Sequence, residues 1–209
     1  MNPSPSQQLR SEILTLRDRL SKDEILSRSA AITRHFISLP LYRRKQEIML
    51  YISYRSEVCT WKLLQRILSD KGYLYAPVTK IDEKRLEIYR VEDADQLIPG
   101  AYGILEPNPA RCQRVDPAIL DLIAVPGSVF SRECGRYGYG GGYYDRFLSM
   151  EAPQAVRIAL AFSFQVKETI PLAPHDELMD YIITENEIIS CGNRITKRTG
   201  NCHEKGNEI

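Results

Sequence analysis

Two segments at the start of the chain alternate apolar and polar residues with the period of an amphipathic helix. In the first segment, Arg10, Arg17 and Arg19 fall on faces other than the apolar one. The apolar positions of this first predicted helix are Leu9, Ile13, Leu16 and Leu20. The second segment starts with a capping-box pattern, Ser21-Lys-Asp-Glu24, and must end before Pro40. Its apolar positions include Ile25, Ile32 and Phe36.

After these helices the apolar residues gather into short runs that are typical of buried strands. Helical stretches over residues 60–68 and 143–148 separate several of the runs. Because strands that alternate with helices favour a parallel sheet, we predict a three-layer α/β/α fold with a mostly parallel central sheet. The run at 86–91 could instead form an edge hairpin. The predicted strands cover residues 48–52, 73–78, 86–91, 122–125, 158–162 and 181–184.

Proline-rich and polar stretches set the limits of the predicted domain. Residues 99–117 contain four prolines and two glycines, which predicts a long ordered loop rather than a linker between domains. We therefore expect one domain over residues 1–190. Residues 191–209 are polar and nearly lack apolar periodicity, so this segment is predicted to be a flexible tail.

Composition and charge remove several classes of function. The 209 residues include 28 basic and 27 acidic ones, which leaves a formal net charge of +1. A net charge this small gives no reason to expect nucleic acid or an anionic membrane as a partner. The start of the chain lacks the features of a secretion signal, and no apolar run is long enough for a membrane span. We expect a cytoplasmic protein and take it to be a monomer.

The cysteines give no sign of a metal site or of a redox pair. They are five in number, widely spaced, and include no Cys-x-x-Cys pair. We therefore expect free thiols at all five positions, which are Cys59, Cys112, Cys134, Cys191 and Cys202.

A glycine-rich segment carries the clearest chemical signal. It follows an apolar strand and precedes a helix, and backbone N–H groups beside a helix start are suited to binding phosphate. Arg136 adds a fixed positive charge. A simple surface turn is the alternative, since short glycine patterns often match by chance, and neither a Walker A ending nor a dinucleotide-fold position is present. The glycines are Gly138, Gly140, Gly141 and Gly142.

The ten residues from Arg136 to Asp145, RYGYGGGYYD, resemble the R-x-G-x-G-x-G-Y-Y-D signature of the 5-formyltetrahydrofolate cyclo-ligases, also called methenyltetrahydrofolate synthetases. Further similarity lies at residues 51–60, 103–107 and 171–185. The resemblance implies a three-layer α/β/α enzyme. It also implies ATP-dependent closure of 5-formyltetrahydrofolate to 5,10-methenyltetrahydrofolate, with release of ADP and phosphate.

The resemblance also implies roles for individual residues. It makes Arg136 and Asp145 the residues that act in the chemistry, and it places Mg²⁺ on Asp145 and Asp176. ATP is implied to lie along Arg10, Arg136, Tyr137, Gly138, Tyr139, Gly140, Gly141, Gly142, Tyr143 and Tyr144. The folate is implied to contact Glu57, Tyr102, Tyr139, Gly140, Gly141, Gly142 and Tyr143.

The residues by themselves leave alternatives open for the three carboxylates. Asp145 could cap or complement the dipole of the helix that follows the glycines. Asp176 could be a turn residue that follows Pro174. Glu57 could be a solvated loop residue.

The chain departs from the family pattern at two positions. The family usually has a lysine four residues before Arg10, where this chain has Ser6, and the glycine upstream of Arg136 is displaced by one, to Gly135. The missing lysine concerns nucleotide affinity, and Arg17 is a candidate to replace it. Two other functions remain open: a non-catalytic folate or nucleotide sensor, or a phosphosugar isomerase or coenzyme A transferase on a similar sheet.

Overall fold

The computed structural model describes residues 4–44 and 46–192. Within them an eight-stranded sheet has the order β13-β12-β10-β7-β1-β2-β3-β6. Strands from β12 to β2 in this order are parallel, whereas β13, β3 and β6 pair antiparallel with their neighbours. The expected mostly parallel sheet is confirmed. The strands are β1 (Ile48–Met49), β2 (Leu74–Lys80), β3 (Arg85–Val91), β6 (Gln113–Val115), β7 (Leu122–Val125), β10 (Val156–Leu160), β12 (Tyr181–Ile183) and β13 (Ile188–Ser190).

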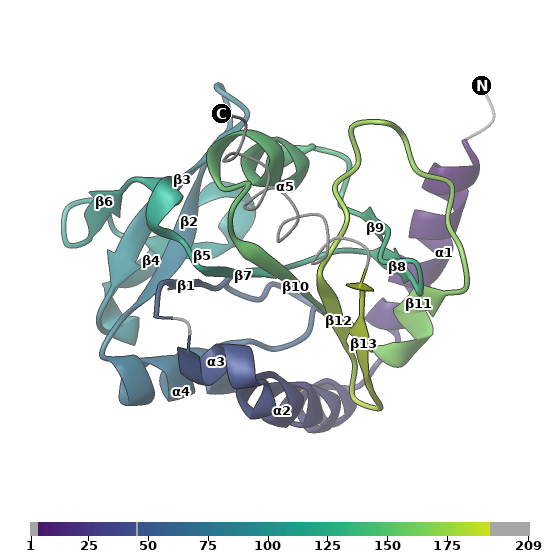
Figure 1. The fold of residues 1–209 in the computed structure, drawn as a ribbon, viewed down its shortest axis with the longest axis horizontal. Coiled ribbons are helices and arrows are strands. Elements are labelled where there is room, and N and C mark those ends of the chain that lie inside the picture. Colours follow the sequence, from purple (N-terminus) through teal and green to yellow (C-terminus); the bar gives the residue numbers. More distant parts are fainter. Residues whose placement is uncertain (1–3, 45, 193–209) are drawn as a thin grey trace, which may run out of the picture.

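Helices cover both faces of this sheet and complete the three layers (Figure 1). Three of them lie on one face: α2 (Lys22–Ser38), α3 (Pro40–Arg44) and α4 (Trp61–Lys71). The other face is covered by α5 (Tyr143–Arg146), which continues as a π-helical turn over Phe147–Glu151. No helix in the described part of the chain is long and apolar enough to span a membrane.

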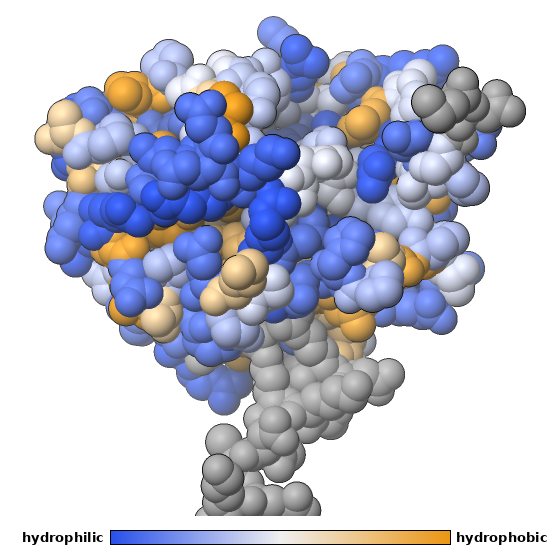
Figure 2. Space-filling model, turned by 90° about the horizontal axis from the view of Figure 1, so that it is seen from above, coloured by the Kyte–Doolittle hydropathy of each residue, from blue (hydrophilic) through white to orange (hydrophobic). Residues whose placement is uncertain are grey.

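The two cores follow from the alternation of side chains along each buried strand. In β7, Leu122 and Ala124 face the core under α2 and α4, whereas Ile123 and Val125 face the core under α5. Figure 2 shows the molecule from above, after a turn of 90° from the view of Figure 1. This surface is mostly hydrophilic, with apolar residues in scattered patches. The apolar side chains of the strands are therefore buried by helices on either side.

The first helix, α1 (Pro5–Asp18), packs against a separate small sheet instead of the main one. This sheet has the order β11-β8-β9, and its buried cluster joins Ile13 to Val129, Tyr137 and Ile170. Its strands are β8 (Val129–Ser131), β9 (Arg136–Tyr137) and β11 (Val166–Lys167). A two-stranded sheet pairs β4 (Leu97–Pro99) with β5 (Leu105–Pro107). Short 3-10 turns are η1 (Ala94–Gln96), η2 (Ala101–Gly103), η3 (Pro117–Ile119) and η5 (Ser163–Gln165).

Capping residues fix the starts of the first two helices. The Ser21 hydroxyl accepts the N–H of Glu24, and the Glu24 carboxylate accepts the N–H of Ser21, so the predicted capping box is confirmed. Ser4 and Gln7 form the same arrangement at the start of α1. These side chains satisfy N–H groups that have no partner inside the helix.

Three of the predicted segments differ from the structure. Residues 99–117 are not one long loop, because parts of them pair as β5 with β4 and as β6 with β3. Residues 86–91 do form a hairpin with β2, but β6 covers their outer side. The first strand is shorter than predicted because the Thr60 hydroxyl donates to the Tyr51 carbonyl and accepts from the N–H of Ser53.

The buried side of α1 also differs from the prediction. Arg17 is only 6% exposed, whereas Leu16 is 40% exposed. Ile13 and Arg17 are four residues apart and therefore share the face that packs on the protein. The prediction that Arg17 lies on a face other than the apolar one is wrong, because apolar spacing alone does not reveal a buried arginine.

Cys134 and Cys191 form a disulfide bond, with their Cα atoms 6.0 Å apart. The expectation of free thiols is therefore wrong for this pair, since their separation of 57 residues concealed that the two segments meet. Cys59 and Cys112 are free. Cys191 also begins the predicted tail, of which residues 193–209, including Cys202, lie outside the described residues.

Candidate functional site

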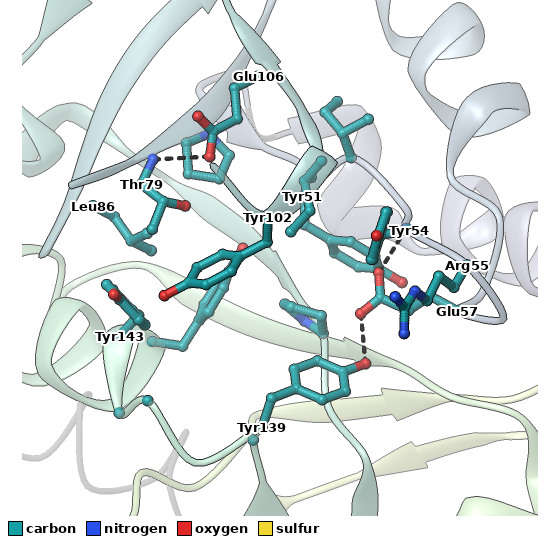
Figure 3. Close-up of a pocket in the computed structure, with 18 of the residues that line it drawn as sticks. Tyr51, Tyr54, Arg55, Glu57, Thr79, Leu86, Tyr102, Glu106, Tyr139 and Tyr143 are labelled. Carbon is teal, nitrogen blue, oxygen red and sulfur yellow. Dashed lines mark hydrogen bonds between the residues drawn. The ribbon is translucent and has the colours of Figure 1, made fainter. Parts of the chain in front are cut away.

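A cavity of about 540 Å³ opens at the carboxyl ends of β1 and β7. Its walls come from α1, the segment after β1, the β2–β3 hairpin, the η2 turn and the glycine loop (Figure 3). Parallel α/β sheets commonly bind ligands at this edge, and the volume is within the range of small-molecule sites. The side chains that line it include Arg17, Glu57, Tyr102, Tyr139, Arg136 and Asp145.

The glycine loop connects β9 to α5, so it lies between a strand and a helix. The sequence predicted that the apolar strand at 122–125 would lead into this loop, whereas β8 and β9 lie between them. Gly142 is the N-cap of α5 with φ of 64°, a left-handed conformation that glycine adopts without a Cβ clash. At Gly138 a Cβ would lie 2.9 Å from Arg136 Nη1, which is closer than the guanidinium allows. The loop therefore needs glycine both to turn into the helix and to let Arg136 pass beneath it.

Arg136 and Asp145 form a buried ion pair below this loop. Arg136 is 2% exposed, and its Nη2 lies 2.7 Å from Asp145 Oδ1. Arg136 Nη1 donates to the carbonyl of Pro126 at 3.1 Å, directly after β7. Asp145 makes no cap of α5, because Gly142 holds that position; its carboxylate also accepts the N–H of Glu177 at 3.4 Å. The pair places a fixed charge of each sign beside the loop.

Glu57 reaches the cavity from the segment after β1. Its Oε2 accepts the N–H of Tyr54 at 2.9 Å, and its Oε1 accepts the hydroxyl of Tyr139 at 2.5 Å (Figure 3). Arg17 Nη1 donates to the same hydroxyl at 2.7 Å. Burial raises the pKa of Glu57 above its usual value, and the hydrogen bonds from Tyr139 and Tyr54 oppose that rise. The alternative of a solvated loop glutamate does not describe this environment.

Tyr102 and Tyr143 meet on another side of the cavity (Figure 3). A hydrogen bond with Tyr102, followed by burial, raises the pKa of Tyr143. Tyr102 is 61% exposed and has φ of 58°, a conformation rarely adopted by residues with a side chain. Glu106 holds this turn by accepting the N–H of Ala101 at 3.3 Å and the N–H of Thr79 at 3.0 Å. Both tyrosines are thus positioned to contact a ligand.

Three residues predicted for the nucleotide or metal gather outside this cavity. The Arg10 guanidinium lies 5.1 Å from the ring centroid of Tyr137, and its Nε has no hydrogen-bond partner among the described residues. Burial, followed by the charge of Asp176, raises the pKa of Tyr137. Asp176 also closes a turn by accepting the N–H of Ala173 at 2.7 Å, as the alternative interpretation of this residue expected. Ser6 lies one turn before Arg10 on α1, with its hydroxyl 3.0 Å from that of Ser4.

Of the two carboxylates predicted to hold magnesium, only one lies at the cavity. In residues 4–44 and 46–192, no three His, Cys, Asp or Glu side chains converge on a metal position. Magnesium commonly uses one or two carboxylates and completes its shell with water and substrate phosphate. Asp145 lines the cavity beside the glycine loop and fits this pattern, whereas Asp176 is not part of the cavity wall.

Sequence reasoning missed several residues that shape the cavity. Arg17 was expected on a face other than the apolar one, because a charged residue at helical spacing gives no sequence signal that it is buried. Glu106 belongs to a stretch with family similarity but received no role. Tyr54 and Thr79 act through their backbone N–H groups, and such roles leave no mark in the sequence.

A three-layer α/β fold whose strand ends open onto a glycine loop, with a buried arginine and carboxylates around the opening, is typical of enzymes that bind small, polar substrates. Residues 3–185 match the model of the 5-formyltetrahydrofolate cyclo-ligase family. The chain belongs to this family, as the RYGYGGGYYD segment indicated. The expected enzyme class is confirmed, together with the ATP-dependent folate reaction by which the family is known.

Individual relatives agree over nearly the whole chain. A probable 5-formyltetrahydrofolate cyclo-ligase of Caenorhabditis elegans is 30% identical over 194 residues, covering 87% of this chain and 93% of that protein. The 5-formyltetrahydrofolate cyclo-ligase of Haemophilus influenzae is 29% identical over 187 residues, covering 88% of this chain and all (100%) of that protein. The NMR structure of Aquifex aeolicus 5,10-methenyltetrahydrofolate synthetase superimposes with a TM-score of 0.78 and 31% identity, covering 97% and 94% of the two chains.

Proposed function

We propose that this chain converts 5-formyltetrahydrofolate to 5,10-methenyltetrahydrofolate with ATP and releases ADP and phosphate. One observation carries the assignment to this cavity: Glu57 and the Arg136–Asp145 pair line the same space. The carboxylate of Glu57 suits the N–H donors of a pterin. The arginine beside the glycine loop suits a phosphate. The cavity can therefore bring the two substrates together.

The reaction needs alignment more than protein nucleophiles. A formamide is a poor electrophile and its oxygen is a poor leaving group. Attack of the formyl oxygen on the γ-phosphate of ATP expels ADP and turns that oxygen into a phosphate ester. N10 then attacks the activated carbon and releases its proton to solvent, and loss of phosphate leaves the methenyl bridge. The protein's part is to hold the oxygen in line and to offset phosphate charge.

The proposed roles divide along the glycine loop. Arg136 offsets the charge of the phosphates, with ATP lying along residues 137–144 and reaching Arg10. The folate contacts Glu57, the loop glycines and the tyrosines at 102, 139 and 143. Mg²⁺ on Asp145 would supply further charge neutralisation, and Asp176 is the proposed second carboxylate because the next residue, Glu177, reaches Asp145 through its N–H. We further propose a cytoplasmic monomer.

The test is to incubate the purified protein with 5-formyltetrahydrofolate, Mg²⁺ and ATP and to follow the methenyl product by absorbance. We expect product only when ATP is present. Product without ATP would favour the isomerase-like or transferase-like alternative. Binding of both substrates without turnover would favour the sensor.

Glu57→Gln should weaken folate binding by roughly 1.5 to 3 kcal/mol and leave ATP binding unchanged. The change keeps the shape of the side chain but removes the negative charge that strengthens its hydrogen bonds. Calorimetry with each substrate measures both constants. Glu12→Gln, an exposed change on α1, is the matched control. Unaltered folate affinity in Glu57→Gln would contradict the placement of folate against this residue.

Ser6→Lys should lower the Michaelis constant for ATP about two- to five-fold without changing that for folate. The substitution restores the charge that the family usually has one helical turn before Arg10. Steady-state kinetics with each substrate varied in turn provide the measurement. Ser11→Lys adds the same charge at another exposed position of α1 and should have no such effect. An ATP constant that stays level or rises would show that another group already supplies this charge.

A further inference from the structure

We propose that Arg17 is a positioning residue of the folate site, which directs the hydroxyl proton of Tyr139 toward Glu57 and so prepares Glu57 to accept the substrate's N–H groups. The proposal rests on the placement of folate against Glu57. Arg17 would act through its neighbours and not through contact with the reacting atoms.

Arg17 ties together three segments that form the cavity wall. It extends from α1 and is 6% exposed. Its Nε donates to the Ser56 hydroxyl at 3.1 Å, and its Nη1 donates to the Tyr139 hydroxyl at 2.7 Å. The Ser56 hydroxyl in turn donates to Asp18. The first helix, the turn before Glu57 and the glycine loop are thus held in one arrangement.

The direction of these hydrogen bonds follows from the chemistry of the guanidinium group. Arginine can only donate, so the Tyr139 oxygen accepts from Arg17 and has one proton left to give. Glu57 Oε1 lies 2.5 Å from that oxygen, and the carbonyl of Gly127 lies 3.4 Å from it. The nearer, charged acceptor takes the proton. Without Arg17, the Tyr139 oxygen loses a charged donor, and its proton is freer to turn away from Glu57.

The positive charge of Arg17 also stabilises the ionised form of Glu57. Burial raises the pKa of Glu57, and Tyr139, Tyr54 and then Arg17 lower it. In the described part of the chain, the groups that act on Glu57 come from α1, the segment after β1, the glycine loop and α5: Arg17, Tyr51, Tyr54, Tyr139 and Tyr144. Arg55, Arg136 and Asp18 also line the cavity, but Arg17 is the cation that acts on the pKa of Glu57. Removal of Arg17 should therefore raise this pKa further.

Folate binding should depend on pH through the protonation of Glu57. A protonated Glu57 loses the negative charge that accepts pterin N–H groups, so folate binding is present above the pKa of Glu57 and lost as the pH falls through it. If that pKa rises on removal of Arg17, the loss begins at a higher pH. A merely structural role for Arg17 would not move this limb of the pH profile.

The experiment compares Arg17→Met with the wild-type enzyme. We expect the folate Michaelis constant to rise roughly 10- to 100-fold and the ATP constant to change less than about twofold. The acid limb of the folate profile should move to higher pH. Arg19→Met is the matched control, because Arg19 is exposed two residues further along the chain. An unchanged folate constant together with an unmoved limb would overturn the proposal.

Combining the substitution with Tyr139→Phe tests whether Arg17 acts through Tyr139. If it does, adding Arg17→Met to Tyr139→Phe should raise the folate constant by much less than it does in the wild-type background. Fully additive losses would overturn this route. Should Arg17→Met fail to melt cooperatively, Arg17→Lys is used instead: it keeps the charge but lacks the fork that bonds Ser56 and Tyr139 together. Arg17→Lys should raise the Michaelis constant for folate and leave the acid limb of the pH profile near its wild-type position. A Michaelis constant for folate equal to that of the wild type would overturn the proposal.

Failure of this proposal is distinguishable from failure of the proposed function. If Glu57→Gln weakens folate binding but Arg17→Met changes neither the constant nor the limb, only the role of Arg17 is lost. If Glu57→Gln has no effect on folate, the placement of the substrate is wrong, whatever Arg17→Met does.

Discussion

Asp145→Ala should lower turnover about 100- to 1000-fold, near 3 to 4 kcal/mol, and leave folate binding nearly intact. The carboxylate lines the cavity beside the glycine loop, where it is proposed to hold Mg²⁺ on the phosphates of ATP. Its loss should therefore act on the chemistry and not on the pterin. Turnover at several magnesium concentrations, measured beside a thermal melt, gives both quantities.

The structure sharpens this experiment because Gly142, and not Asp145, is the N-cap of α5. A true cap, Ser21 at α2, supplies the control: Ser21→Ala should cost about 1 kcal/mol of stability and leave the rate of the folded enzyme unchanged. Asp145→Asn keeps an acceptor for Arg136 but removes the charge, so its turnover should also fall. A variant that melts early yet keeps its rate per folded molecule would contradict the metal role.

Arg136→Met should lower the free energy of unfolding by about 3 to 5 kcal/mol and remove most activity. The substitution leaves the Asp145 carboxylate, only 16% exposed, without its cation, and leaves the carbonyl of Pro126 without its donor. Removing one partner of a buried pair costs more than the pair itself contributes. Urea unfolding followed by fluorescence measures the loss.

Two further variants test whether burial is the cause. Arg66 and Asp70 form an exposed pair with the same N–O distance of 2.7 Å, so Arg66→Met should leave the free energy of unfolding nearly unchanged. Adding Asp145→Asn to Arg136→Met removes the stranded charge and should restore part of the stability but not the turnover. Equal losses in Arg66→Met and Arg136→Met would show that burial does not set the energy of these pairs.

The parallel core of the sheet was predictable from sequence because its strands are buried on both faces. Ile123 and its neighbours in β7 form a continuous apolar run, and a run of this kind needs no knowledge of its partners. The short strands β8 and β9 contain Ser131 and Arg136, and their pairing depends on β11 and on each other. Such elements are set by tertiary contacts that local patterns do not contain.

The sequence identified the residues of the glycine loop, but it did not show which distant residues they contact. The signature identified Arg136 and Asp145 but not that they pair with each other. Glu57 was assigned to folate, yet its contact with Tyr139 joins residues 82 positions apart, and Arg17 reaches Tyr139 across 122 positions. Side chains that meet over such separations can be inferred only once the fold is known.

The disulfide between Cys134 and Cys191 closes the last part of the chain into a covalent ring. Arg136, the glycine loop, α5 and the turn at Asp176 all lie within this ring. Arg17, Glu57 and Tyr102 lie on the open chain before it. The two parts of the cavity wall thus differ in connectivity: a single backbone cut inside the ring leaves both pieces covalently joined, whereas a cut before residue 134 leaves no covalent link to the earlier segment.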